Sequence, residues 1–158
     1  MKNKSDTFFL ERAIAIALES VERGGGPFGA VVVENGKIIA ESGNCVRQHN
    51  DPTAHAEVEA IRRACEIKQS HSLENCVLYA SCEPCPMCLG AIYWARLQRV
   101  VFSATRHHAA RIGFDDNFIY TELGKDIIER SIKTVHIDLP SAHALFEVWE
   151  RKEDRDNY

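Results

Sequence analysis

The sequence predicts an α/β fold, and three features indicate it. Asn35-Gly36, the residue pair most typical of a tight hairpin turn, separates the apolar runs 29–33 and 38–41. Two further strands are expected at 76–80 and 99–104, and each follows a segment with helical periodicity, which predicts parallel pairing. The 158 residues, 45% apolar and 27% charged, are typical of a single globular domain spanning the whole chain.

Helices are expected where apolar side chains recur every three or four residues. The first is predicted over 8–22 and ends at three glycines followed by Pro27. Asp51 and Pro52 are expected to begin a second helix, to about residue 67, as its N-cap and first helical residue. The remaining predicted elements are a helix from Pro84 or Cys85 to about 95, an irregular stretch over 105–120, a short helix over 121–130, an edge strand over 134–138, and a last helix from Pro140 toward Trp149.

The charge and composition exclude several classes of protein. The formal net charge of −4 argues against a nucleic-acid-binding surface, which usually carries an excess of basic residues. No apolar run approaches the roughly 18 residues of a membrane span, and residues 8–10 are too short for a secretion signal. A cytoplasmic protein without a membrane or nucleic-acid partner is therefore expected. In that setting the six cysteines are expected to be metal ligands and free thiols.

Two motifs have the spacing of metal ligands. Cys85 and Cys88 are separated by two residues, which places both sulfur atoms on one side of a helix and makes them half of a Zn²⁺ site. His55 is the expected third ligand, because His-x-Glu followed by Pro-Cys-x-x-Cys is typical of zinc nucleobase deaminases. In such a site Glu57 would be the residue that moves protons.

Three protein ligands would leave a fourth zinc position for water, as in catalytic zinc sites. Glu57 is expected to take the proton of that water and return it to the substrate. Because His55 and Glu57 are two residues apart, they can share one target only if their helix approaches it nearly end-on. Helix N-termini also present unpaired N–H groups, and that of Cys85 is a candidate donor to the substrate.

Each of these residues also has a simpler interpretation. His55 by itself would often be a capping or core histidine, and Glu57 could be a carboxylate that stabilises a helix start. Cys82 could be the third ligand of a purely structural metal site. Both motifs together, each expected where a helix begins, favour a catalytic zinc site over these alternatives.

Several segments resemble known deaminases. The motifs at 51–57 and 83–88 resemble the cytidine deaminase superfamily. A closer resemblance, to the bacterial guanine deaminases of that superfamily, runs over nearly the whole chain and is carried by residues 26–30, 88–96 and 113–120. It implies a cytidine-deaminase-like three-layer α-β-α sandwich around a central five-stranded mixed sheet. It also implies a homodimer in which segments near 140–158 are exchanged between subunits.

The resemblance further implies which residues contact the substrate. Phe28 would offer a stacking face and Asn44 a donor to O6 or N7 of a purine. Asp116 would be a second catalytic carboxylate, and Tyr158, with Trp94 beneath it, a lid. The full set that the resemblance implies is Phe28, Asn44, Ala56, Cys85, Trp94, Asp116 and Tyr158. From the residues alone, Phe28 could be a core aromatic, Asn44 a loop residue, Asp116 part of a solvated turn and Tyr158 an unordered chain end.

The implied activity is zinc-dependent hydrolysis of guanine to xanthine and ammonia, a reaction of purine metabolism, with triazine analogues as side substrates. A tRNA adenosine deaminase shares both metal motifs, but the basic residues near 151–155 are interleaved with acidic ones. A cytosine or nucleoside deaminase is a second alternative, because a few loops re-specify such pockets. A non-enzymatic zinc-binding scaffold is the third, and the presence of Glu57 argues against it.

Overall fold

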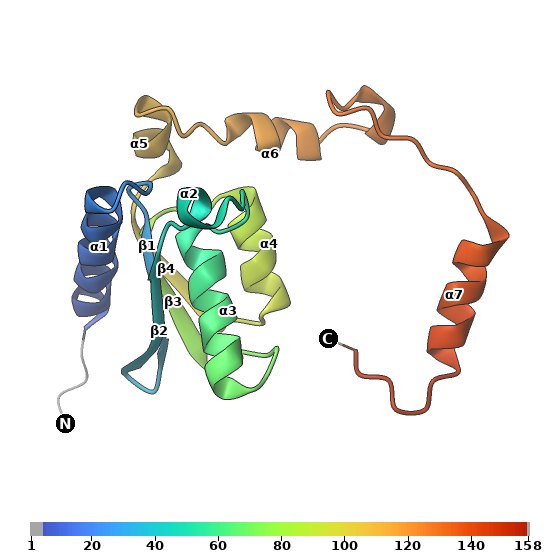
Figure 1. Cartoon of the computed structure of the whole chain (residues 1–158), viewed down its shortest axis with the longest axis horizontal. Helices are drawn as coiled ribbons and strands as arrows, with labels where there is room; N and C mark the ends of the chain where they lie inside the picture. Colours follow the sequence, from blue (N-terminus) through green and yellow to red (C-terminus); the bar gives the residue numbers. More distant parts are fainter. Residues whose placement is uncertain (1–4, 158) are drawn as a thin grey trace. The chain divides into compact units, whose positions relative to one another are not determined.

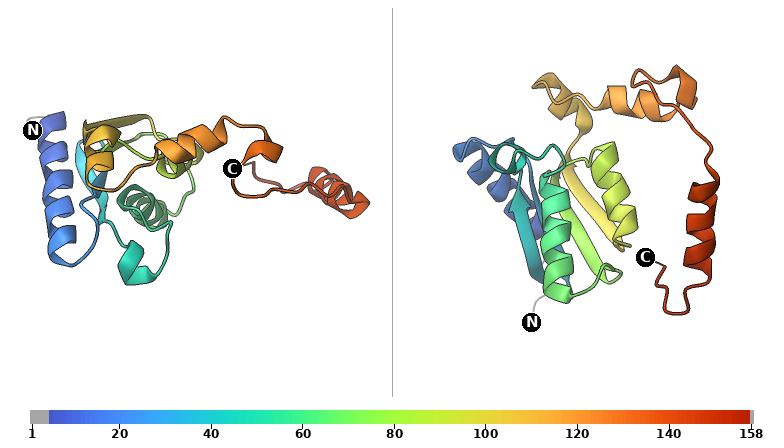
Figure 2. Two further views of the ribbon diagram at one scale, coloured as in Figure 1. Left: turned by 90° about the horizontal axis from the view of Figure 1, so that it is seen from above. Right: turned by 45° about the vertical axis from the view of Figure 1, so that its right-hand side comes forward.

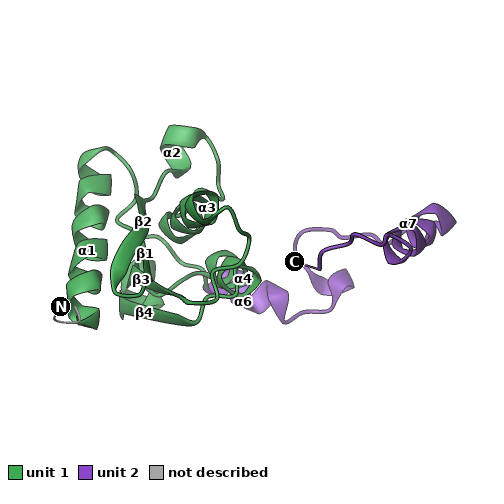
Figure 3. Cartoon of the chain, turned by 90° about the horizontal axis from the view of Figure 1, so that it is seen from below, with its two compact units in different colours: residues 1–116 green, residues 117–158 purple. Residues whose placement is uncertain are grey.

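The structure is a computed structural model that describes residues 5–157. The chain separates into two compact units, residues 1–116 and residues 117–158, which are drawn in green and purple in Figure 3. All the strands described, and the helices that cover them, belong to the first unit. No helix among the described residues has the length and apolar character to cross a membrane.

The first unit is built on a four-stranded mixed sheet (Figure 1). Strands β1 (Gly29–Glu34) and β2 (Lys37–Gly43) form the predicted antiparallel hairpin, with Asn35 and Gly36 both at positive φ, as the tight turn requires. The strand order is β2-β1-β3-β4, in which β3 (Cys76–Cys82) and β4 (Arg99–Ala104) pair in parallel, as predicted.

Helices cover both faces of this sheet (Figures 1 and 2). Helix α1 (Asp6–Glu22) packs on one face, where Phe9, Ala13 and Ile16 join side chains of β1 and β3 in one apolar cluster. Helices α3 (Ala56–Lys68) and α4 (Pro86–Trp94) pack on the other, around a second cluster. The predicted three-layer α-β-α sandwich is therefore confirmed.

Gly29 sets how closely α1 approaches the sheet. A Cβ atom there would lie 2.2 Å from the carbonyl oxygen of Ala13 and 2.6 Å from the backbone nitrogen of Ala17, so the helix backbone itself would have to move. We expect Gly29→Ala to lower the free energy of unfolding by about 1–3 kcal/mol, as overpacking does. The matched control is Gly90→Ala, in α4, where a Cβ meets nothing within 4 Å and a gain of about 0.5–1 kcal/mol is expected. Thermal and urea unfolding of both variants would measure this; equal effects would contradict the close packing.

The predicted five-stranded sheet is wrong by one strand. Residues 134–138 pair with no other described strand, and Val135 and Ile137 are 67% and 72% exposed. The alternation of side chains in this segment is strand-like, but a strand exists only where its backbone N–H and C=O groups find a neighbouring ladder.

The predicted start of the second helix is also wrong. Helix α3 begins at Ala56, four residues after Pro52, and His55 is its N-cap. The Asp51 carboxylate caps a turn instead, because its Oδ1 accepts the Thr53 backbone N–H at 2.8 Å and the Thr53 hydroxyl at 2.7 Å. The competition between an Asx turn and a helix N-cap is local, and the sequence does not show which of the two forms.

Two other predictions concern short helices. The stretch 105–120 is less irregular than predicted, because α5 (Arg106–Arg111) forms there and α6 begins near its end, at Asn117. A further short helix, α2 (Val46–His49), lies between β2 and α3. In the second unit, α6 (Asn117–Leu123) ends at Gly124, and a 3₁₀ turn (Ile127–Glu129) follows, so the predicted helix over 121–130 is interrupted. Helix α7 (Pro140–Glu150) begins and ends as predicted.

Candidate active site

Two helix N-termini of the first unit converge on one point. His55 is the N-cap of α3 (φ −67°, ψ 155°), and Cys85 is the N-cap of α4 with nearly the same backbone (φ −67°, ψ 168°). Pro86 favours the start of α4 at this position, because its fixed φ suits the first helical residue. Cys88 lies three residues further on, so both thiols of the Cys-x-x-Cys motif face the α3 terminus.

The three predicted ligands are brought together. The Sγ atoms of Cys85 and Cys88 are 3.5 Å apart, and each lies 3.5 Å from Nδ1 of His55. Ligands of a tetrahedral Zn²⁺ with bonds of about 2.1–2.3 Å would be roughly 3.5–3.8 Å apart. The geometry and the chemistry of the donors therefore fit a zinc ion, with a fourth position left open.

Of the two thiols, Cys85 already favours the charged state that a metal needs, whereas Cys88 does not. The hydrogen bond between Cys85 and Cys88, with a further contribution from His55, lowers the pKa of Cys85 to about 4. The same hydrogen bond and burial raise the pKa of Cys88. Contact with Cys85 raises the pKa of His55. A divalent cation would replace the shared proton and leave two thiolates and a neutral imidazole.

Glu57 lies in the first turn of α3, beside these ligands. It is buried, with 7% of its surface exposed, and burial raises the pKa of its carboxyl group. Both His55 and Cys88 interact with this carboxyl group, which places it against the ligand cluster. Because His55 precedes the helix in an extended conformation, the side chains of His55 and Glu57 reach the same point, as an end-on helix approach predicts.

Asp116 lies near the same cluster. Burial raises the pKa of its carboxyl group, and the negative charge of Cys85 raises it further, while Arg106 opposes both effects. Its neighbour Asp115 is exposed to solvent. The two aspartates therefore differ in environment, and the pKa of Asp116 responds to the charge of Cys85.

Phe28 and Asn44 are neighbours, and Phe28 packs against the apolar cluster that contains Ala56. A Cβ added to Gly26 would lie 3.2 Å from the Phe28 ring and 3.4 Å from Cγ of Asn44, so both side chains surround this glycine. The backbone N–H of Asn44 donates to the Phe28 carbonyl at 3.1 Å. Oδ1 of Asn44 accepts the Val46 N–H at 3.3 Å, which orients the amide and leaves its NH₂ group as the donor.

Comparison with known proteins agrees with this arrangement. Residues 3–104 match the family described as cytidine and deoxycytidylate deaminase zinc-binding region. The chain belongs to this deaminase family. It is 51% identical to guanine deaminase from Bacillus subtilis over 95% of this chain and 97% of that protein. The crystal structure of that enzyme has a TM-score of 0.96 at 49% identity and covers 98% of this chain and 99% of its own.

Two other deaminases are more distant. The tRNA-specific adenosine deaminase of Aquifex aeolicus is 34% identical over 92% of this chain and 93% of its own. The solved guanine deaminase from Nitrosomonas europaea is 31% identical, with a TM-score of 0.66, and covers 68% of this chain and 63% of its own. The predicted resemblance to bacterial guanine deaminases of the cytidine deaminase superfamily is confirmed.

Within this deaminase, two predicted site residues are placed differently from the rest. Ala56 is fully buried and its side chain belongs to the core, so only its backbone could face a substrate. Trp94 ends α4, about 9 Å along the helix from Cys88, and is 69% exposed. Tyr158 lies outside the described residues.

Cys82, the alternative ligand of a structural site, is buried, and burial raises the pKa of its thiol to about 11, so it stays protonated at neutral pH.

Sequence reasoning missed two residues that shape the site. The Phe114 ring packs edge-on against Phe28, with centroids 5.0 Å apart, and so belongs to the same wall as the predicted stacking residue. The Glu83 carboxylate accepts the Arg106 N–H at 2.9 Å and holds the start of α5, the helix that leads to Phe114. Both residues lie in segments that carry the resemblance, Glu83 in 83–88 and Phe114 in 113–120, but neither was predicted as a site residue.

Proposed function

We propose that this protein is a zinc-dependent guanine deaminase, which hydrolyses guanine to xanthine and ammonia. The observation that carries the proposal is the buried Glu57 beside the cluster of His55, Cys85 and Cys88. The 51% identity to a guanine deaminase over nearly the whole of both chains supports the choice of base. In this proposal the three ligands hold the zinc ion.

The zinc ion would supply an acidified water as the nucleophile. In the reaction the water oxygen bonds to C2 of guanine and the bond from C2 to the amino nitrogen breaks, so one proton of the water must move to the ring nitrogen N3 and the other to the departing ammonia. Glu57 would hold and return these protons, since burial raises its pKa toward the operating pH. The Cys85 N–H, at a helix start, would donate to the substrate.

We assign the substrate contacts to the residues predicted to surround the purine. Phe28, supported by Phe114, would stack on the purine, and the amide of Asn44 would donate to its O6 or N7 atom. Asp116 would exchange protons at the leaving amino group, which in guanine is on C2 rather than on C6 as in adenine. The backbone of Ala56, with Trp94 and Tyr158 as a lid, would complete the pocket.

The main alternative is deamination of adenosine in tRNA, and the charge of the C-terminal segment argues against it. Residues 140–158 contain three basic and five acidic residues, a net charge of 3 − 5 = −2. Arg151 pairs with Glu147 at 3.0 Å, and Lys152 pairs with Asp154 at 2.6 Å. A polyanion would be repelled by this segment, because phosphate binding depends on an excess of unpaired cations.

The direct test is incubation of the zinc-loaded protein with guanine, adenine, cytosine and cytidine, followed by ammonia release and the ultraviolet spectrum. We expect xanthine and ammonia from guanine at least 100-fold faster than product from the other three, because their amino groups lie on other ring atoms. An absence of guanine turnover would overturn the proposal, and turnover of an adenosine-34 tRNA stem-loop would favour the alternative.

The substitution Asp116→Asn tests the second carboxylate. We expect kcat to fall by about 100-fold with little change in zinc content, because a proton-transfer group is removed without touching a ligand. The control Asp115→Asn removes the same charge one residue away, at an exposed position, and should keep kcat within a factor of about two. An equal loss of kcat in both variants would contradict a catalytic role for Asp116.

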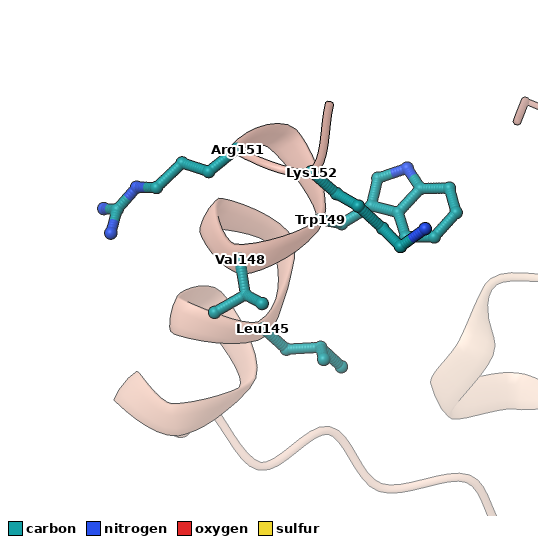
Figure 4. A pocket seen from close by; sticks show the side chains of 5 residues that line it. All are labelled: Leu145, Val148, Trp149, Arg151 and Lys152. Atoms are coloured by element: carbon teal, nitrogen blue, oxygen red, sulfur yellow. The ribbon is translucent and has the colours of Figure 1, made fainter. Parts of the chain in front are cut away.

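We also propose that the protein is a homodimer that buries its second unit. Many apolar side chains are exposed there in the single chain, and a monomer rarely leaves such a surface open. Helix α7 gives an example, with Leu145, Val148 and Trp149 lining an apolar hollow of about 470 Å³ (Figure 4). The exposed apolar residues are Phe118, Ile119, Leu123, Ile127, Ile128, Ile132, Val135, Ile137, Leu139, Leu145, Phe146, Val148 and Trp149.

The molar mass of the protein, measured by light scattering as it elutes from a size-exclusion column, tests this dimer. We expect a mass of twice the 17.8 kDa chain. The double variant Phe146→Asp with Val148→Asp should shift the protein toward monomer, because two charges cannot be buried in an apolar contact without a large cost. A control with Glu147→Gln, an exposed polar position between them, should remain dimeric. A single-chain mass for the unaltered protein would contradict the proposal.

A further inference from the structure

A second group of metal-binding side chains lies outside the candidate active site. Cys45, His49 and Glu59 each present one ligand atom, and these atoms all lie within 4.8 Å of one another. Cys45 is the N-cap of α2, and His49 is the last residue of that helix, so the two are four residues apart on one side of a single turn. Glu59 comes from α3 and faces them.

Glu59 is oriented toward the other two side chains of this group. It is buried, with 8% of its surface exposed, and its Oε1 accepts a hydrogen bond from Nη1 of Arg62 at 2.5 Å. Its other oxygen, Oε2, lies 3.9 Å from Nδ1 of His49. One oxygen is therefore held by an outer partner while the other faces the imidazole, as is common for carboxylates that bind metals.

Two members of the group, Cys45 and His49, are accessible from solvent, whereas Glu59 is buried. Cys45 and His49 line a cavity of about 470 Å³, together with Ser42 and Asn44 from the end of β2 and the loop after it. A hydrated cation could therefore reach the sulfur and nitrogen atoms without unfolding either helix. The imidazole of His49 is itself about half exposed.

From these observations we propose a second zinc-binding site formed by Cys45, His49 and Glu59. A thiolate, an imidazole and a carboxylate are the donors that Zn²⁺ takes in proteins, and the two negative charges balance the ion. Water from the cavity would fill the fourth position. The 3.9 Å between Nδ1 of His49 and Oε2 of Glu59 exceeds the 3.5 Å separations of the first cluster, and Arg62 adds a nearby positive charge. Zinc therefore binds here more weakly than at the first site.

A cation at this site would link α2 to α3 next to Asn44. That residue precedes Cys45 in the chain and orients its amide through the first N–H of α2, at Val46. The metal would thus add to the stability of the loop between β2 and α3, where the backbone N–H groups of Asn44 and Cys45 already donate to the carbonyls of Phe28 and Ala54. Binding to the folded state alone raises the unfolding temperature as the occupancy of the site increases.

Metal stoichiometry tests the site without reference to activity. The metal-free full chain is titrated with Zn²⁺ alone, and bound zinc is measured by a competing chromogenic chelator. We expect two equivalents for the unaltered protein, the second at least 10-fold weaker, and a rise in unfolding temperature as the second equivalent binds. Cys45→Ser and His49→Ala should each bind only one equivalent. The control Cys65→Ser, which removes a thiol elsewhere on α3, should bind two.

The same titration with Co²⁺ reports the ligands directly. The charge-transfer absorption of cobalt thiolates should grow in two steps in the unaltered protein and only in the first step in Cys45→Ser. His49→Ala changes an exposed side chain, so loss of the second equivalent in this variant cannot be attributed to misfolding. One equivalent in the unaltered protein, or two in both Cys45→Ser and His49→Ala, would overturn the proposal. These outcomes do not depend on whether guanine is the substrate.

Discussion

Replacement of Glu57 by glutamine is expected to lower kcat by about 10²–10⁴-fold while zinc binding is retained. The amide keeps the size of the side chain but cannot take up or return a proton, and general acid–base groups contribute about this much to rates. The substitution also removes a buried carboxyl group whose pKa is raised by burial, so the variant should be at least as stable as the unaltered protein.

The measurement is kcat for guanine, together with zinc content and unfolding temperature for the same preparation. Glu66→Gln is a matched control, because Glu66 lies on the same helix at an exposed position. It should leave kcat and zinc content unchanged. A Glu57→Gln variant that keeps more than a tenth of the activity would show that another group carries the protons.

Replacement of Cys88 by serine is expected to lower zinc affinity by more than 100-fold and to abolish turnover at micromolar zinc. Loss of a ligand in direct contact with the metal should lower the metal affinity by more than the roughly 10–100-fold typical of losing one of its outer partners. Serine keeps the shape of the side chain, but its hydroxyl does not ionise at neutral pH as a thiol bound to zinc does. Cys88 is fully buried, so circular dichroism must first establish that the variant is folded.

The control for this experiment is Cys82→Ser. Cys82 is close in sequence to Cys88 and is also buried, but its thiol has a pKa of about 11 and donates to the Thr105 carbonyl at 3.5 Å. Its removal should leave zinc bound. Zinc loss in Cys82→Ser with retention in Cys88→Ser would instead support a structural site built on Cys82, the alternative that the sequence left open.

The parts of the fold that follow short-range rules could be predicted from the sequence. The hairpin depends on the turn preference of Asn35-Gly36, and the helix at 140–150 on Pro140 and an apolar repeat. The unpaired state of 134–138 could not be predicted, because its pattern suits a strand but the pairing partner is a property of the assembled sheet. The predicted start of α3 was wrong because an Asx turn and an N-cap use the same carboxylate.

The ligand set of the candidate site was determined by the sequence, because His55, Cys85 and Cys88 lie in two motifs whose spacing reflects the chemistry of zinc. Their convergence was decided by the tertiary structure. Sheet order and the packing of α3 against α4 bring the side chains of two N-caps within 3.5 Å across 30 residues of chain. In the second cluster, formed by Cys45, His49 and Glu59, convergence again depends on the tertiary structure. Cys45 and Glu59 have no motif spacing, and only the fold places them together, because contact between helices depends on packing rather than on distance along the chain.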